Sequence, residues 1–221
     1  MHRTRARSRG GAAGTLADAI TLSFDPGYTD PGVLILSNGN LTLNNDNYYG
    51  NSFATVAKNS GQWYWEIVVD TVGVAGNVMI GVGERSDTDL IPFTYVAGYT
   101  PTSYVYVAHA TKVNAGSETS YGAALFDTDV VGVALDLEAG TLEFFKNNVS
   151  QGVAFTGISG SLSPVVGFLA SNTNQVTAHF AAADLVYAPP TGFVALDEGW
   201  VDLSAGQRLD IDFILDTSTL G

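Results

Sequence analysis

The sequence of 221 residues contains no cysteine. This absence excludes disulfide bonds, zinc sites built from thiolates and cysteine nucleophiles. Charged residues make up only 14% of the chain, well below the roughly 25% that is usual for soluble domains. Glycine, asparagine, threonine and serine supply much of the remaining polarity. No apolar run approaches the ~20 residues that a membrane-spanning helix needs, so we expect no membrane insertion.

Basic residues are scarce and unevenly placed. The chain has nine Lys and Arg against 22 Asp and Glu, a formal net charge of −13. An acidic body repels nucleic acid and anionic membranes, so we expect nucleic-acid contact only through the basic arm at the start of the chain. This arm has no apolar segment after its arginines, unlike a secretory signal, although an organellar transit peptide has a similar composition. The four arginines of the arm are Arg3, Arg5, Arg7 and Arg9.

Short runs rich in β-branched and aromatic residues alternate with turn residues from Val33 onward. This spacing is typical of an all-β sandwich, and no run has the 3.6-residue period of an amphipathic helix. A hairpin is predicted over 129–146 with its turn at 138–140, followed by a tight turn at Asn147–Asn148. Further strands are predicted at 62–70, 77–82, 103–108, 164–170, 175–181 and 185–187.

The predicted organisation has three parts. Residues 1–32 form a basic arm and connector with one candidate edge strand, residues 33–198 form the sandwich, and residues 199–221 form a tail. The tail contains one strand-like run that could extend the sheet edge of another subunit. The alternating apolar residues of this run are Leu209, Ile211, Phe213 and Leu215.

Several blocks of the sequence follow one another in a recognisable order. They are SNGNLT at 37–42, SGQWYWE at 60–66, MIGVG at 79–83, DVVGVALD at 129–136, GTLEFFKN at 140–147, LSPVV at 162–166 and YAPPTGF at 187–193. Together they resemble a SPRY domain over about residues 33–196. The resemblance implies a bent, concanavalin-like sandwich of two antiparallel sheets that is not catalytic and binds peptides, proteins or glycans through loops at one end. The SNGNLT and APPTGF blocks are most similar to versions in bacteriophage virion proteins.

Carboxylate pairs offer two alternatives to a binding function. The run DIDFILD at 210–216 echoes the paired acids of glycan hydrolases, which need carboxyl groups about 5 Å apart. It lies outside the family domain, so we interpret it as an amphipathic strand with its acids in water. Asp87 with Asp89, and Asp127 with Asp129, would suit calcium, but such spacing is more typical of turns. We predict no catalytic residues, no metal site and no cofactor.

The segment between residues 84 and 103 is the candidate ligand-binding loop. It holds Phe93, Tyr95 and Tyr99 among glycine and proline, and it also contains the pair formed by Asp87 and Asp89. Tyrosine displayed on a rigid scaffold gives a large contact area at a small entropic cost. A loop that packs on its own aromatic residues is the alternative interpretation.

Two other residue types are assigned to the interior. Trp63 and Trp65 alternate on one strand, so they share a face and are expected in the core. The three histidines have no metal-ligand spacing, and His179 is expected to be a strand residue with a satisfied hydrogen bond.

These features predict a non-catalytic structural or binding component of a bacteriophage virion, exposed as a head decoration or in the tail-fibre apparatus. Its termini would anchor it to other virion proteins and to copies of itself, with the arginine arm gripping carboxylates or phosphates. The expected location is the virion, assembled in the host cytoplasm. The alternatives are an adaptor that recognises a peptide and a module that binds a host-surface glycan.

Overall fold

The computed structural model describes residues 22–45, 49–73, 77–87, 89–90, 95–169, 173–198, 200–204 and 207–210. Within these ranges all regular secondary structure is β-strand, as the sequence predicted, and no helix is long and apolar enough to cross a bilayer. The strands are β1 (Phe24–Thr29), β2 (Leu34–Ser37), β3 (Thr42–Asn45), β4 (Gly50–Ala54), β5 (Gln62–Thr71), β6 (Val78–Glu84), β7 (Ser103–Val107), β8 (Thr111–Asn114), β9 (Ser117–Ser120), β10 (Val130–Asp136), β11 (Thr141–Lys146), β12 (Val149–Thr156), β13 (Leu162–Phe168), β14 (Asn174–His179), β15 (Val194–Ala195), β16 (Trp200–Ser204) and β17 (Gln207–Asp210).

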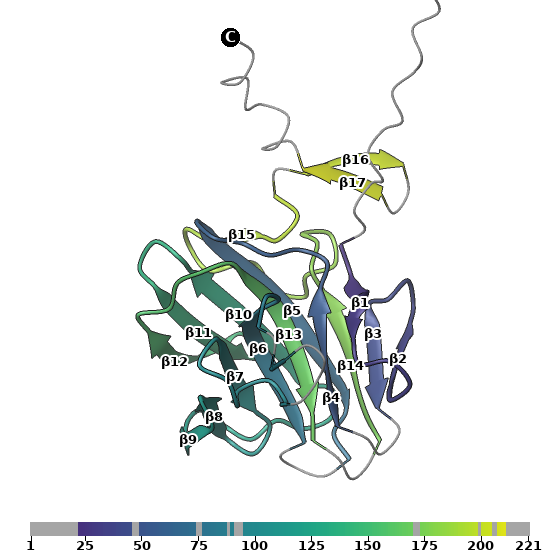
Figure 1. Ribbon diagram of the computed structural model, residues 1–221. Coiled ribbons are helices and arrows are strands. Elements are labelled where there is room, and N and C mark those ends of the chain that lie inside the picture. The colour runs from purple at the N-terminus through teal and green to yellow at the C-terminus, as the bar shows by residue number, and fades with distance from the viewer. Residues whose placement is uncertain are drawn as a thin grey trace, which may run out of the picture.

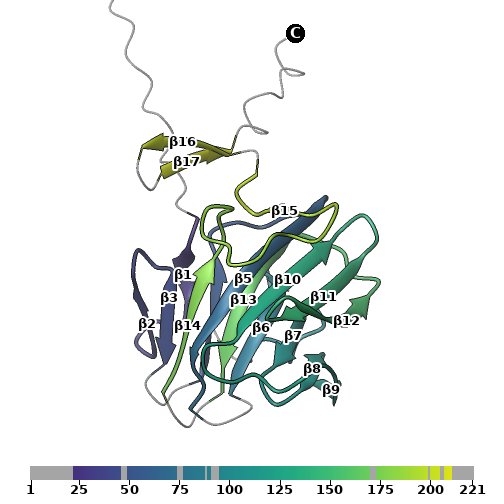
Figure 2. The same ribbon diagram turned by 180° about the vertical axis from the view of Figure 1, so that it is seen from behind.

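Two large sheets face each other (Figures 1 and 2). The seven-stranded sheet has the order β1-β4-β13-β6-β7-β8-β9, and the other has the order β12-β11-β10-β5-β14-β3-β2, with β15 joined in parallel to β5. The predicted hairpin is confirmed as β10 and β11, and the turn residues Asn147 and Asn148 both have positive φ. Strands β16 and β17 pair only with each other, and of the tail run only Leu209 lies within them. Ile211, Phe213 and Leu215 fall outside the described residues, as do the four arginines of the arm.

The main core lies between the sheets. Trp65 is fully buried there and the partly buried Trp63 packs against the same cluster, which confirms the predicted core face. On β6, Val78 and Ile80 belong to this core, whereas Met79 between them belongs to a second cluster. Because successive side chains of a strand point to opposite faces, the second cluster lies on the outer face of the seven-stranded sheet. This cluster consists of Phe53, Met79, Leu90, Ala97, Val105, Val107, Val113 and Val165.

The sandwich begins earlier than the sequence indicated. The boundary predicted at Val33 is too late, because β1 pairs with β4 and Phe24 is fully buried, with its ring edge-on to Phe180 at 5.5 Å. The turn signals of this segment, with Pro26, led it to be interpreted as a connector. An edge strand with an irregular register tolerates a proline, because the missing N–H does not interrupt a central ladder.

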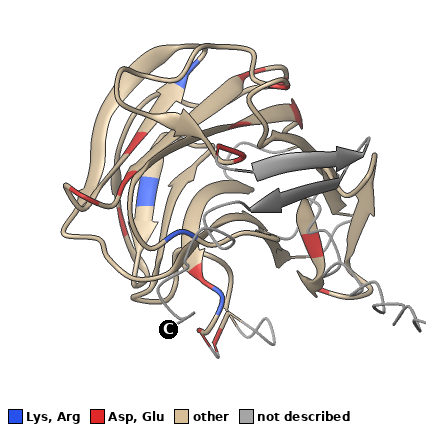
Figure 3. Ribbon diagram, turned by 90° about the horizontal axis from the view of Figure 1, so that it is seen from above, with Lys and Arg blue, Asp and Glu red and all other residues tan. Residues whose placement is uncertain are grey.

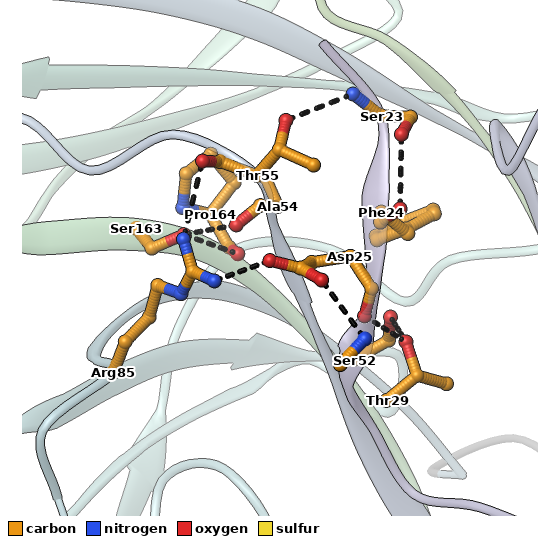
Figure 4. Close-up of polar contacts among 11 residues, drawn as sticks. Ser23, Phe24, Asp25, Thr29, Ser52, Ala54, Thr55, Arg85, Ser163 and Pro164 are labelled. Atoms are coloured by element: carbon orange, nitrogen blue, oxygen red, sulfur yellow. Dashed lines mark hydrogen bonds and ion pairs between the residues drawn. The ribbon is translucent and has the colours of Figure 1, made fainter. Parts of the chain in front are cut away.

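Arg85 fastens β1 to the rest of the sandwich (Figure 4). Its guanidinium forms an ion pair with Asp25 and donates to the carbonyl oxygen of Thr55 at 3.1 Å. It also lies 3.7 Å from the ring centroid of Tyr28. These contacts join β1 to the end of β6.

The connection between β14 and β15 covers part of the outer face of the other sheet. The carboxylate of Glu66 is fully buried and accepts hydrogen bonds from the N–H of Val186 at 2.6 Å and of Tyr187 at 3.0 Å. The hydroxyl of Tyr64 donates to the same carboxylate at 3.0 Å. The strand predicted at 185–187 is therefore wrong, because its N–H groups bond to a side chain instead of a neighbouring strand.

His179 is the last residue of β14, as predicted, but its Nδ1 is buried without a hydrogen bond. This nitrogen lies 3.9 Å from a carboxylate oxygen of Glu66. Nδ1 therefore does not make the hydrogen bond that was expected of this histidine.

Both ends of the sandwich lie at the same pole. Ser23, just before β1, accepts a hydrogen bond from the N–H of Thr55, just after β4, and Val194 of β15 pairs with Trp63 near the start of β5. In Figures 1 and 2, β15 and the start of β1 lie at the upper pole, while β4 begins and β13 ends at the lower pole. We call these the terminal pole and the loop pole.

Edge strand β12 is closed by side chains from the opposite sheet. Its carbonyl oxygens at Gly152 and Ala154 accept hydrogen bonds from the hydroxyl of Tyr121 and the ammonium of Lys112. Its pairing with β11 also contains register shifts. Occupied acceptors and bulges make an edge a poor template for a further strand.

We predict that Phe24→Ala lowers the free energy of unfolding of the full chain by about 3–5 kcal/mol, the usual cost of a buried phenylalanine. Urea denaturation followed by tryptophan fluorescence would measure it. Phe126→Ala is the matched control, because Phe126 is 59% exposed and its loss should cost far less. An equal and small effect of both substitutions would mean that β1 is not part of the folded unit.

A second prediction concerns alkaline pH. Burial raises the pKa of Tyr106 to about 12, and it also raises the pKa of Tyr64 and of Tyr121. In the unfolded chain a tyrosine ionises near pH 10, so above that pH the unfolded state loses protons that the folded state keeps. The free energy of unfolding should therefore fall above about pH 10, by about 1.4 kcal/mol per pH unit for each such tyrosine.

Urea titrations between about pH 9 and pH 11 would measure this slope. The substitution Tyr106→Phe should reduce it, because one ionisable group with a raised pKa is removed. A slope that is unchanged in Tyr106→Phe would contradict the assignment.

Candidate functional site

Three exposed tyrosines surround an apolar depression at the loop pole. Its volume is about 400 Å³ and its lining residues are Tyr49, Tyr95, Val96, Tyr99 and Leu169. The exposed fractions are 58% for Tyr49, 49% for Tyr95 and 43% for Tyr99. Large aromatic side chains left half-exposed around a hollow are typical of interaction sites. We call this feature the tyrosine depression.

Long-range strand pairing brings these residues together. Tyr49 immediately precedes β4 and Leu169 immediately follows β13, and the neighbouring residues Gly50 and Phe168 are paired across the two strands. Tyr95 and Tyr99 come from the connection between β6 and β7, residues 85–102. The depression therefore depends on three segments that are distant in sequence.

Asn51 holds the β6–β7 connection on the sheet. Its side-chain amide donates to the carbonyl oxygen of Tyr95 at 2.8 Å and accepts from the N–H of Ala97 at 2.8 Å, and Asn51 itself is fully buried. The N–H of Gly98 donates to the hydroxyl of Ser103 at 2.8 Å. These bonds satisfy main-chain groups that burial would otherwise leave unpaired.

Two glycines allow the connection to lie this close. Gly98 has a φ of +93°, and a Cβ there would come within 2.6 Å of the side chain of Val105. A Cβ on Gly167 would come within 2.9 Å of Val96. Leu90 and Ala97 of the connection are fully buried in the outer cluster. The backbone that carries Tyr95 and Tyr99 is thus clamped, while their rings remain exposed.

The predicted binding loop is therefore partly found at the site. Tyr95 and Tyr99 line the depression, whereas Phe93 lies outside the described residues. The carboxylate of Asp87 accepts hydrogen bonds from the N–H of Asp89 at 2.9 Å and from the hydroxyl of Thr102. The loop packs on the sheet through the aliphatic residues Leu90 and Ala97 and not on its own aromatic rings, and ligand binding by its exposed tyrosines stays a prediction.

The carboxylates of the other aspartate pair also accept hydrogen bonds from main-chain N–H groups. Asp127 accepts from the N–H of Val72 at 2.7 Å, and Asp129 accepts from the N–H of Phe126 at 2.7 Å. Asp129 also lies 3.0 Å from the ammonium of Lys146. No group of three potential ligands close enough to hold a metal ion occurs among the described residues.

Sequence reasoning missed Tyr49, Val96 and Leu169 as members of the site and Asn51 as its clamp. Tyr49, Asn51 and Leu169 meet through the pairing of β4 with β13, which no local pattern reveals.

Every Lys and Arg side chain of the sandwich contacts other groups of the same chain. Residues 22–198 contain four Lys or Arg and 17 Asp or Glu, and Figure 3 shows acidic positions on many elements and basic positions on few. Arg85, Lys112 and Lys146 donate to main-chain carbonyl oxygens. Each cation also lies near an aromatic ring centroid: Lys58 with Trp63 at 3.6 Å, Arg85 with Tyr28 at 3.7 Å, Lys112 with Phe155 at 5.2 Å and Lys146 with Phe126 at 5.0 Å.

A second depression, of about 390 Å³, lies at the terminal pole. Its lining includes Val186, Phe193 and Glu198, from segments adjoining the point where the chain leaves the sandwich. The tyrosine depression is the better candidate site, because it combines three exposed aromatic rings with a backbone held by buried hydrogen bonds.

Comparisons with known proteins agree with this architecture. A family model described as the SPRY domain matches residues 62–182, more than half of the chain. The E3 ubiquitin-protein ligase RKP of Arabidopsis thaliana is 29% identical over 144 residues, which are 62% of this chain and 10% of that protein. The chain therefore spans about a tenth of the length of this relative.

Solved structures show the same fold. The SPRY domain of human HERC1 has a TM-score of 0.62 at 22% identity, covering 75% of this chain and 100% of that one. The PSpry domain of TRIM65 has a TM-score of 0.56 at 17% identity, covering 73% and 93%.

We predict that Asn51→Ala destabilises the chain by about 2–4 kcal/mol, because a buried carbonyl and a buried N–H each lose their partner. Hydrogen exchange at the amide of Ala97 should accelerate more than exchange in β10. Asn59→Ala is the control, since Asn59 is exposed. Unchanged exchange at Ala97 would show that Asn51 does not hold the connection.

Proposed function

Because the chain belongs to the SPRY family, whose domains mediate protein–protein interactions, we propose that it is a non-catalytic module that binds a segment of a partner protein in the tyrosine depression. The observation that carries this proposal is the placement of Tyr49, Tyr95 and Tyr99, half-exposed around one hollow. Tyrosine loses few rotamers on binding and offers both an apolar face and a hydroxyl, so it suits recognition of peptide segments.

The two poles give the module a direction. The chain enters and leaves the sandwich at the terminal pole, whereas the tyrosine depression lies at the loop pole. A domain attached through its termini would therefore point its binding surface away from the attachment. This geometry supports a role as an anchored, outward-facing component of a larger assembly.

Within this role we propose the bacteriophage virion as the assembly, with the domain serving as a head decoration or in the tail-fibre apparatus. The support is the resemblance of the SNGNLT and APPTGF blocks to virion versions of the domain, together with an acidic, cysteine-free body. Other virion proteins would then be its partners, and the virion its location.

Glycan binding is the second candidate, favoured by the same exposed aromatic faces. The lining side chains of the tyrosine depression offer phenolic hydroxyls as their polar groups, with no amide or carboxylate. A peptide, with its own apolar and aromatic side chains, fits such a lining better than a polyhydroxylated sugar, which needs many hydrogen-bond partners.

The test is a selection from a random-peptide display library on the immobilised full chain, with a glycan array in parallel. Peptides selected by the wild type should bind the triple variant Tyr49→Ser, Tyr95→Ser and Tyr99→Ser at least about tenfold more weakly, because aromatic anchors dominate such interfaces.

A matched triple variant removes exposed apolar side chains elsewhere: Ile35→Ala, Val149→Ala and Val186→Ala. These residues are as exposed as the tyrosines, and their loss should leave the peptide affinities unchanged. Equal binding of the peptides to the wild type and to the tyrosine variant would contradict the proposal. Tyrosine-dependent binding of a glycan, without any peptide binding, would identify the ligand as a sugar.

A further inference from the structure

We propose that the ligand of the tyrosine depression is the arginine-rich segment 3–9 of a second copy of this chain. The proposal rests on the proposed function, because it requires that the depression bind a protein segment. It follows from three observations: the chemistry of the exposed rings, the charge of the sandwich and the positions of the two poles.

The first observation is how this protein uses its aromatic rings. Every Lys and Arg within residues 22–198 lies near a ring face, with Lys58 3.6 Å from Trp63 and Arg85 3.7 Å from Tyr28. The electron-rich face of an aromatic ring attracts a cation. Across the described residues, no Lys or Arg lies over the three rings of the tyrosine depression, so these faces are open to a cation from outside.

The second observation is electrostatic. The sandwich has four Lys or Arg and 17 Asp or Glu, so its formal net charge is −13. Its cations already contact rings, carbonyl oxygens and carboxylates of the same chain. Two acidic residues flank the depression. The main-chain oxygen of exposed Asp89 accepts from the N–H of Tyr95 at 3.0 Å, and the side chain of Asp30 lies against Gly50, which follows Tyr49.

A cationic ligand would therefore be attracted both by the ring faces and by the negative charge of the sandwich. Arginine fits better than lysine, because its planar guanidinium stacks on a ring and still donates in the ring plane to carboxylates.

The chain itself contains such a ligand. Arg3, Arg5, Arg7 and Arg9 are four of its nine basic residues and alternate with small or polar residues. When bound in extended form, this spacing places the guanidinium groups on one side at intervals of about 7 Å. Four cations on one side can reach several rings and both flanking acids at once.

The third observation selects a second copy. The sandwich starts at the terminal pole and the depression lies at the loop pole, so the basic segment of one copy meets the depression of the next when copies lie end to end. Such a contact joins two different surfaces, so it can repeat from copy to copy.

Sedimentation velocity of the full chain tests the proposal. The wild type should form oligomers that grow with concentration and dissociate in high salt. Replacement of the four arginines by glutamine, or of the three tyrosines by serine, should each give a monomer. Tyr49→Phe, Tyr95→Phe and Tyr99→Phe together keep the ring faces and should retain association. In high salt, where the wild type is dissociated as well, all variants should have the same melting temperature as the wild type, because the tyrosines are exposed and the basic segment precedes the sandwich.

Mixing the glutamine variant with the serine variant is the decisive experiment. The glutamine variant keeps an intact depression and the serine variant keeps an intact basic segment, so together they should form a 1:1 complex that does not grow further. A synthetic peptide of residues 1–14 should bind the glutamine variant, and its citrulline counterpart, which lacks the charge, should bind at least tenfold more weakly.

Wild-type oligomers that persist in the glutamine variant would overturn the proposal. So would a monomeric wild type, including one in which peptide 1–14 binds only the glutamine variant, since the segment would then occupy the depression of its own copy. If peptide 1–14 fails to bind while library peptides still require the tyrosines, this inference fails and the proposed function stands.

Discussion

The side-chain amide of Asn51 is the interaction on which the candidate site depends. It pairs with both the carbonyl oxygen of Tyr95 and the N–H of Ala97, at a fully buried position on the outer face of a sheet. On the other sheet the carboxylate of Glu66 likewise binds a covering segment, because it accepts hydrogen bonds from two N–H groups of the β14–β15 connection. Each sheet thus has a buried polar side chain that helps to fix a covering segment. An apolar residue in either place would leave main-chain groups without partners, at a cost that packing alone does not recover.

The fold was largely predictable from sequence because its signals are local. Gly140 and the pair Asn147–Asn148 mark tight turns by their tolerance of positive φ, and β11 between these turns alternates the buried Leu142 and Phe144 with less buried residues. The failures occurred where the chain departs from local rules. The edge strand expected before residue 33 runs through Pro26 and belongs to the sandwich, and the apolar run 185–187 resembled a strand although its N–H groups bond to Glu66.

The site was less predictable than the fold. Tyr95 and Tyr99 were found because tyrosine in a glycine- and proline-containing loop suggests recognition. Tyr49 and Leu169 could not be found, because they meet only through the pairing of Gly50 with Phe168, more than a hundred positions apart in the chain. A composite surface of this kind is a property of the strand order and not of any one segment.

The order of strands also has a kinetic consequence. In one sheet β13 lies between β4 and β6, and in the other β14 lies between β3 and β5, so neither sheet is continuous until residues 162–179 have been made. During synthesis the first 160 residues can form only hairpins and partial sheets with open internal edges. Folding of such a topology is dominated by long-range pairing and is slow, in the range of milliseconds to seconds. Unpaired strand edges in such partly folded chains favour aggregation, and the net negative charge of the chain opposes it until the last two central strands are inserted.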